Sequence, residues 1–111
     1  MFLSLPNGAA QKIINKTFKK YKKLKFIDLS ADFRISNPKI YYKNYKIKHS
    51  ASKLIKYAIY SISEFTSKII HKYRIIANPG CYTTSIQLPL IPLLKKGLIK
   101  SKNITIDSKS G

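Results

Sequence analysis

The sequence predicts an α/β fold built on a parallel sheet. Two short apolar runs, residues 1–5 and 25–29, flank a stretch in which apolar side chains recur at helical spacing. A strand, a helix and a second strand in this order form a βαβ unit, whose strands run parallel. A third apolar run, residues 73–77, again leads into a helical pattern. Because ligands collect beyond the carboxyl ends of the strands in such sheets, we expect the functional residues there.

The first strand, residues 1–5, ends at a turn sequence, Pro6-Asn7-Gly8. Asn7 is expected to cap the following helix, residues 9–22. The apolar stripe of this helix should pack on the core. It consists of Ile13, Ile14, Phe18 and Tyr21.

A lysine- and tyrosine-rich segment, residues 37–49, should form a surface helix that begins near Pro38, because proline suits the first helical turn. A short helix ending at Tyr57 and an extended segment, residues 58–62, follow. Glu64 is expected to cap or begin a helix over residues 65–72.

The last helix, residues 84–96, is apolar on most sides, which indicates burial between layers. Pro89 and Pro92 lie inside this pattern, so we expect a kink or break near Pro89. Gly97 should end the helix. Residues 103–107 are expected to form a final strand.

Cys81 is the only cysteine, and it lies where the third strand turns into a helix. Gly80 permits a tight turn and close approach of another molecule. The first turn of a helix offers unpaired N–H groups and the positive end of the dipole, which stabilise a thiolate. This placement indicates a nucleophile. The alternative is a small buried hydrophobe, as most lone cysteines are.

Asp32 and Arg34 form a charged pair in the loop after the second strand. Asp32 is expected to make a local salt bridge or to cap a helix. Arg34 is expected to receive an anionic group, because its guanidinium matches carboxylate and phosphate geometry.

The two histidines, His49 and His71, are expected to be solvated. Neither has metal-ligand spacing to Cys81, so no metal site is predicted. A Cys-His hydrolase would need one of them against Cys81, and nothing in the sequence supports that arrangement.

The net charge of +18 comes almost wholly from lysine. Such a charge suggests a nucleic-acid partner. Lysine, isoleucine, asparagine and tyrosine, however, have AT-rich codons, so genome composition accounts for the charge without such a partner. No apolar run of about 18 residues is present, so no membrane span is predicted. A single cysteine fits a reducing compartment, and a cytoplasmic location is expected.

Residues 78–84, Asn-Pro-Gly-Cys-Tyr-Thr-Thr, resemble the catalytic segment of the N-acetyl-gamma-glutamyl-phosphate reductases, of the semialdehyde dehydrogenase family. That family usually has proline at the position of Thr83. Residues 27–34, Ile-Asp-Leu-Ser-Ala-Asp-Phe-Arg, match a second block of the family closely. Residues 2–8 and 106–111 resemble two further blocks.

Residues 60–64 are a weakened form of the family's Tyr-Gly-Leu-Pro-Glu, with Ser61 and Ser63 as departures. The resemblance covers the whole chain. It implies a partial doubly wound, Rossmann-like sheet. Residues 1–77 would be the C-terminal part of a dinucleotide-binding domain, and residues 78–111 the start of a catalytic domain.

The resemblance also implies an activity. Cys81 would attack the acyl phosphate, and hydride from NADPH would reduce the resulting thioester. The implied cofactor is NADP, the substrate is a small acyl phosphate, and the full-length enzyme is expected to be a homo-oligomer. The residues expected to bind the substrate are Arg34, Asn78 and Gly80. The residues expected to bind the cofactor are Pro6, Gly8, Ser30, Ser110 and Gly111.

No Gly-x-Gly-x-x-Gly fingerprint precedes the first strand, and the chain ends within a small-residue loop. Against the family pattern we therefore expect an interior fragment that is inactive when isolated. Two alternatives stay open from the residues alone. One is a basic nucleic-acid-binding module, and the other is a folded remnant without activity of its own.

Overall fold

The computed structural model describes residues 1–109, which form two compact units. The first unit, Met1–Pro79, contains the sheet, and the second begins at Gly80 and contains the last helix. The predicted roles of Ser110 and Gly111 lie outside the described residues. None of the helices within residues 1–109 is long and apolar enough to cross a membrane.

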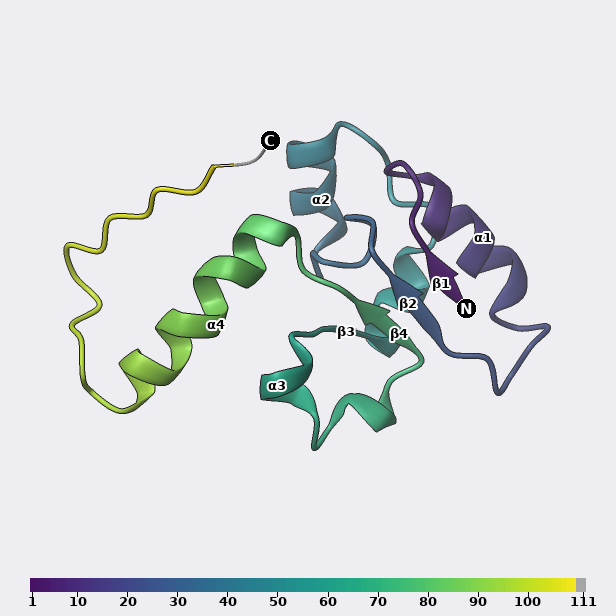
Figure 1. Ribbon diagram of the computed structural model, residues 1–111. Helices are drawn as coiled ribbons and strands as arrows, with labels where there is room; N and C mark the ends of the chain where they lie inside the picture. The colour runs from purple at the N-terminus through teal and green to yellow at the C-terminus, as the bar shows by residue number, and fades with distance from the viewer. Residues whose placement is uncertain (110–111) are drawn as a thin grey trace. The chain divides into compact units, whose positions relative to one another are not determined.

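The first unit is built on a four-stranded sheet in which every strand pair is parallel, which confirms the predicted α/β class (Figure 1). The strand order is β1-β2-β4-β3, with β2 and β4 in the middle. In the register, Ile27 of β2 lies opposite Phe2 and Ile76. The strands are β1 (Phe2–Leu3), β2 (Phe26–Asp28), β3 (Ala58–Tyr60) and β4 (Ile75–Ala77).

Helices occupy the connections between the strands, as a parallel sheet requires. In the first unit they are α1 (Ala9–Thr17), α2 (Pro38–Tyr45), α3 (Ser63–Thr66) and two 3₁₀ helices, η1 (Ser52–Tyr57) and η2 (Ile70–Lys72). The predicted start of α2 at Pro38 is confirmed, and the Asn37 side chain caps this helix by accepting from the Lys39 N–H at 2.9 Å. The helix predicted over residues 65–72 is instead split between α3 and η2.

The core lies between α1 and the strands. Ile14 and Phe18 pack against Phe26 and Ile75, and the Phe18 and Phe26 rings stack with their centroids 6.1 Å apart. Two members of the predicted stripe do not take part, because Ile13 and Tyr21 are exposed.

Helix α1 ends at Thr17, before the predicted end at residue 22. The Arg74 guanidinium explains the early end. It donates to the carbonyl oxygens of Phe18 at 3.0 Å, Tyr21 at 2.7 Å and Leu24 at 3.3 Å, and it lies 3.7 Å from the centre of the Phe18 ring. These bonds satisfy carbonyl groups in the turn that leads to β2, so the chain leaves the helix without losing hydrogen bonds.

Asp32 is the polar centre of the first unit. It is fully buried, and its carboxylate accepts from the N–H groups of Gly8 at 2.7 Å and Gln11 at 3.0 Å. Asp32 is therefore a capping group, but for a helix distant in sequence. The prediction that Asn7 caps α1 was wrong, since its Oδ1 accepts from the Ala31 N–H instead. A charged carboxylate binds these N–H groups more strongly than an amide oxygen does.

Tyr41 and His49 complete the network around Asp32. The buried Tyr41 hydroxyl donates to Asp32 Oδ1 at 2.6 Å and accepts from Gln11 Nε2 at 3.2 Å. Burial and the hydrogen bond to Asp32 raise the pKa of Tyr41, so its hydroxyl remains a donor. His49 Nε2 lies 2.7 Å from the Asp32 carbonyl oxygen, and His49 Nδ1 accepts from the Ala51 N–H at 3.2 Å.

The prediction of a solvated His49 was wrong. Its ring is buried and makes edge-on contacts with Phe33 and Tyr41, at centroid distances of 5.2 and 5.1 Å. Both ring nitrogens have backbone partners, which removes the cost of burying them. His71, in η2, is exposed as predicted.

The second unit contains α4 (Cys81–Lys95), which is longer than predicted and continuous through Pro89 and Pro92, so the expected break is absent. No residue of α4 is fully buried, so the predicted burial between layers is not found in this unit. Gly97 ends the helix region with φ +67°, in agreement with the prediction. Residues 103–107 are exposed and form no strand, which corrects the last predicted element.

The Tyr41 hydroxyl allows the network to be tested. We expect Tyr41→Phe to lower the free energy of unfolding by about 2 kcal/mol, because one deletion removes two buried hydrogen bonds, one of them to a carboxylate. Chemical denaturation monitored by circular dichroism measures this change. Tyr42→Phe, at the exposed neighbouring position, is the matched control and should have no effect. Equal stability of the Tyr41→Phe variant and the unmodified chain would contradict the assignment.

Candidate functional site

The segments that follow β1 and β2 meet at one edge of the sheet. The Leu29 N–H donates to the Leu3 carbonyl oxygen at 2.8 Å, and just beyond it Asn7 Oδ1 accepts from the Ala31 N–H at 3.4 Å. The segment after β4 reaches the same edge, because the Asn78 N–H donates to the Asp28 carbonyl oxygen at 2.8 Å. The convergence expected from a parallel topology is therefore present for these three segments.

Arg34 links the ends of β2 and β4. Its Nε donates to the Asn78 carbonyl oxygen at 2.8 Å, and its Nη2 donates to the Leu29 carbonyl oxygen at 2.7 Å. Both bonds hold backbone groups, and Arg34 makes no salt bridge to Asp32 within residues 1–109. Arg34 therefore fixes the end of β4, from which the chain continues into the Pro79-Gly80-Cys81 turn. Its predicted contact with an anionic substrate stays a prediction.

Asp28 is a buried carboxyl group at the end of β2 that the sequence analysis did not single out. Its Oδ1 accepts from the Ser30 N–H at 3.0 Å, whereas its Oδ2 has no hydrogen-bond partner among the described residues. Burial raises the pKa of Asp28, because desolvation disfavours the charged form. The signal that could have identified it is an acidic residue inside the apolar run 25–29, since this position in a parallel strand is usually apolar.

Cys81 is the first residue of α4 and is exposed to solvent. The preceding residue, Gly80, is the N-cap, has extended backbone angles and provides no side-chain cap. The Gly80 carbonyl oxygen accepts from the Thr84 N–H at 2.9 Å and from Thr84 Oγ1 at 3.0 Å. The N–H groups of the first turn precede this first helical bond, so they are available to a ligand.

A cavity of about 280 Å³ opens beside the Cys81 side chain within the second unit. It is lined by Cys81, Tyr82, Ser85, Ser108 and Lys109. The residues around this space thus carry a thiol, three hydroxyl groups and an ammonium group. Lys109 also lies 3.6 Å from Asp107, but both side chains are largely exposed, so this ion pair holds the lysine only weakly. The sequence analysis missed Ser85 and Lys109, because nothing in their spacing links them to Cys81.

Thr83, where the family has proline, is the third residue of α4. The N–H group at this position has no partner within the helix, so proline and threonine both fit the first turn. The departure therefore leaves the helix start intact.

The residues predicted to contact the cofactor lie after β1 and β2. Pro6 is exposed, whereas Gly8 and Ser30 are buried. The Gly8 N–H is bound by Asp32, and the Ser30 hydroxyl accepts from the Asp32 N–H at 3.1 Å. An added Cβ at Gly8, where φ is +90°, would lie 3.4 Å from Ile47 Cγ2. The Gly8 N–H and the Ser30 hydroxyl oxygen are thus already bonded within the chain, and the predicted contact of these residues with a cofactor stays a prediction.

Comparison with known proteins gives the class first. The family model for the semialdehyde dehydrogenase dimerisation domain matches residues 81–111. The match begins at Cys81, where the second unit starts its helix, and it follows the parallel α/β unit described above. Residues 81–111 are therefore similar to this domain of the semialdehyde dehydrogenases.

Within that class the similarity is to N-acetyl-gamma-glutamyl-phosphate reductases. The enzyme of this name from Afipia carboxidovorans is 45% identical over 111 residues, which is 100% of this chain and 32% of that protein. The Alkaliphilus metalliredigens enzyme is also 45% identical, with the same coverage. A probable chloroplastic enzyme of Arabidopsis thaliana is 49% identical over the whole chain and 27% of its own length. The chain thus spans about a third of the length of these relatives, and the resemblance seen in the sequence is confirmed.

The Asp28 carboxyl group predicts a pH-dependent stability. Burial raises the pKa of Asp28 in the folded state, so the protonated carboxyl group is the form that the fold favours. Its contribution to the free energy of unfolding is therefore fully present at low pH and is lost as the pH rises through the folded pKa. We expect Asp28→Asn to raise the free energy of unfolding at pH 7 by about 1–2 kcal/mol, since the amide has the shape of the carboxyl group but cannot carry the charge that burial disfavours. The gain should shrink as the pH falls.

Denaturant titrations at several pH values measure this effect. Asp107→Asn, at a largely exposed carboxyl group, is the matched control and should change stability little at any pH. A loss of stability in Asp28→Asn that is the same at every pH would show that the carboxyl group is not destabilised by burial.

Proposed function

We propose that this chain carries the nucleophile of an NADP-dependent acyl-phosphate reductase that converts N-acetyl-gamma-glutamyl phosphate to N-acetylglutamate 5-semialdehyde, a step of arginine biosynthesis. The observation that carries the proposal is the exposed Cys81 at the first position of α4, beside a cavity that also contains hydroxyl and ammonium groups. The homology to N-acetyl-gamma-glutamyl-phosphate reductases over the whole chain supports the substrate class.

In the acyl-transfer step, the Cys81 thiolate attacks the carbonyl carbon of the acyl phosphate. A carbon–sulfur bond forms, the carbon–oxygen bond to the phosphate breaks, and inorganic phosphate leaves with the electron pair. The product is a thioester on Cys81. Division of the reduction into two easier steps is the reason for a covalent intermediate.

The start of α4 supplies the electrostatic part of this step. Negative charge develops on the carbonyl oxygen during the attack, and N–H groups of the first turn, such as that of Tyr82, stabilise it. Lys109 lines the same cavity and suits the leaving phosphate with its positive charge, whereas the Ser85 hydroxyl in the same wall already donates to the Tyr82 carbonyl oxygen at 2.8 Å. Asn78 and Gly80 set the geometry of the turn, and Arg34 holds the Asn78 carbonyl oxygen in place.

NADPH, when bound, supplies the hydride that reduces the thioester. Pro6, which is exposed, would contact the cofactor, whereas the buried Gly8 and Ser30 would support this edge of the sheet from within, through their hydrogen bonds to Asp32. An exposed thiol nucleophile requires a reducing compartment, which favours the cytoplasm, although the Arabidopsis relative is named chloroplastic.

We also propose a homo-oligomer for the full-length protein. The family model that matches residues 81–111 is named for dimerisation, and no apolar side chain of α4 is fully buried in this unit. Contact with a second subunit would remove this apolar surface from water.

A chimera tests the proposed function. The 111 residues of this chain would replace the aligned third of the Alkaliphilus metalliredigens relative. We expect the chimera to catalyse phosphate-dependent reduction of NADP by N-acetylglutamate semialdehyde. The assay follows the absorbance of the reduced nicotinamide that forms. Cys81→Ser in the chimera should reduce turnover by about 10⁴-fold or more, because the intermediate cannot form.

Thr83→Pro is the control within the same turn, and it should leave both folding and turnover nearly unchanged, because proline fits this helix position. A chimera that folds and retains full turnover after Cys81→Ser would refute the assignment of the nucleophile. A folded chimera that lacks turnover even with Cys81 present would refute the proposed activity of this segment.

A further inference from the structure

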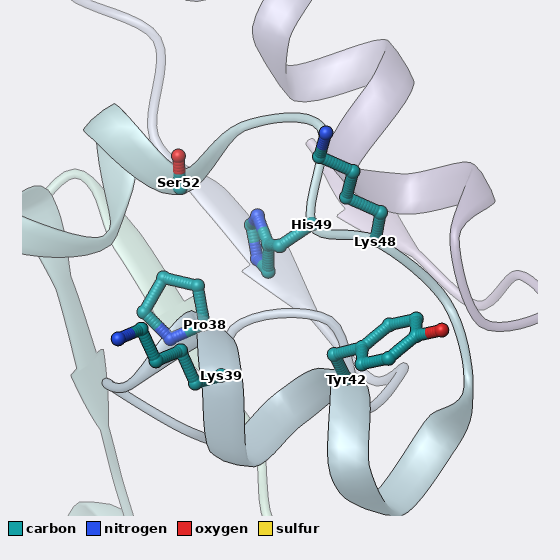
Figure 2. A pocket seen from close by; sticks show the side chains of 6 residues that line it. All are labelled: Pro38, Lys39, Tyr42, Lys48, His49 and Ser52. Atoms are coloured by element: carbon teal, nitrogen blue, oxygen red, sulfur yellow. The ribbon is translucent and has the colours of Figure 1, made fainter.

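A second cavity, formed by residues outside the proposed acyl-transfer site, lies in the first unit (Figure 2). Its volume is about 500 Å³, which is within the range that holds small-molecule ligands. The wall is formed by α2, the loop that follows it and the start of η1. The residues that line it are Pro38, Lys39, Tyr42, Lys48, His49 and Ser52.

The floor of this cavity is rigid because His49 is fixed from several sides. Its two ring nitrogens are bonded to backbone groups of Asp32 and Ala51, and its ring packs edge-on against Phe33 and Tyr41. A ligand that enters the cavity therefore meets a surface that is already ordered, and binding does not incur the entropic cost of ordering it.

Two rings stand beside this floor. Figure 2 shows Pro38 and Tyr42, both on α2, on either side of the His49 ring. Tyr42 is 56% exposed, whereas its neighbour Tyr41 is fully buried. An exposed aromatic ring in a cavity wall offers a stacking surface for a planar group.

The charge of the cavity is positive. Lys39 and Lys48 contribute ammonium groups from two different segments of the wall, and Ser52 contributes a hydroxyl donor. Neither lysine makes a salt bridge within the described residues, and none of the four acidic residues of the sequence lines the cavity. The local charge thus lacks an internal counterion and favours an anionic ligand.

We propose that this cavity binds a phosphorylated compound with a planar ring, of the size of a mononucleotide. The ring stacks on Tyr42 and lies over the His49 floor. The phosphate is bound by the ammonium group of Lys48, with Ser52 as a neutral donor, while Lys39, on the other side of the His49 ring in Figure 2, adds to the positive charge of the cavity. This site is independent of the proposed reductase activity, because it uses none of the residues assigned to acyl transfer.

The test is a titration of the 111-residue chain with adenosine monophosphate, followed by amide chemical shifts at about 150 mM salt to screen weak surface contacts. We expect saturable one-to-one binding with shifts around Tyr42 and His49. The double variant Lys39→Ala/Lys48→Ala should weaken binding about 10-fold. Tyr42→Ala should weaken binding of adenosine monophosphate about 5-fold, yet leave the weaker binding of inorganic phosphate unchanged.

The highly basic surface makes a charge control essential. Lys43→Ala/Lys53→Ala removes two lysines from α2 and η1 that do not line the cavity, so it should leave the affinity within about 2-fold. An equal loss of affinity in this control would overturn the proposal, because it would show non-specific attraction. Shifts that do not saturate, or equal affinity for adenosine monophosphate and inorganic phosphate, would also overturn it.

Discussion

The first unit depends on one buried carboxylate. Asp32 accepts hydrogen bonds from the first turn of α1 and from Tyr41 of α2, while its own backbone carbonyl oxygen is bound by His49. Two segments that are distant in sequence, the start of α1 and α2, are therefore fixed around this side chain, and a third, the loop with His49, is held at the backbone of the same residue. The carboxylate is acceptable in the interior only because each of these donors is present, since a buried charge without partners is very costly.

The two arginines extend the same principle to the ends of the strands. Arg74 binds three carbonyl groups between α1 and β2, and Arg34 binds one carbonyl group after β2 and one after β4. The planar guanidinium provides several donors in fixed directions, so one side chain satisfies several backbone acceptors. Only two of the 22 basic residues are arginines, and both serve this role. The flexible lysines are left for the surface and for the cavity beside α2.

The sequence was sufficient for the elements that depend on local patterns. The parallel topology, the start of α2 at Pro38 and the position of Cys81 at a strand-to-helix turn all follow from apolar periodicity and turn residues. The true end of α1 and the burial of His49 could not be predicted, because both depend on partners that are distant in sequence. Arg74 ends the helix from 56 residues beyond Phe18, and Phe33 and Tyr41 enclose the histidine ring.

In the candidate site, too, the features set by local sequence could be predicted and those set by distant residues could not. Local spacing identifies the thiol and the N–H groups around it, because a helix start is a local feature. Ser85 and Lys109 carry no comparable signal, and their place in the cavity wall appears only when the chain is folded. Asp28 is visible as an acidic residue in an apolar run, but its unpaired oxygen atom appears only in the structure. The prediction of a strand over residues 103–107 was wrong because the pattern is local but pairing is not. Alternating apolar residues form a stable strand only where a neighbouring strand pairs with them.

The most direct measurement of the central claim is the mass of the acylated protein. The chimera with the Alkaliphilus relative would be mixed with N-acetyl-gamma-glutamyl phosphate in the absence of reduced cofactor, quenched in acid and digested for mass spectrometry. The account predicts one N-acetylglutamyl group on the peptide that contains Cys81, in a linkage that hydroxylamine cleaves at neutral pH, as expected for a thioester. Acylation at another residue, or none in a chimera that turns over once NADPH is added, would contradict it.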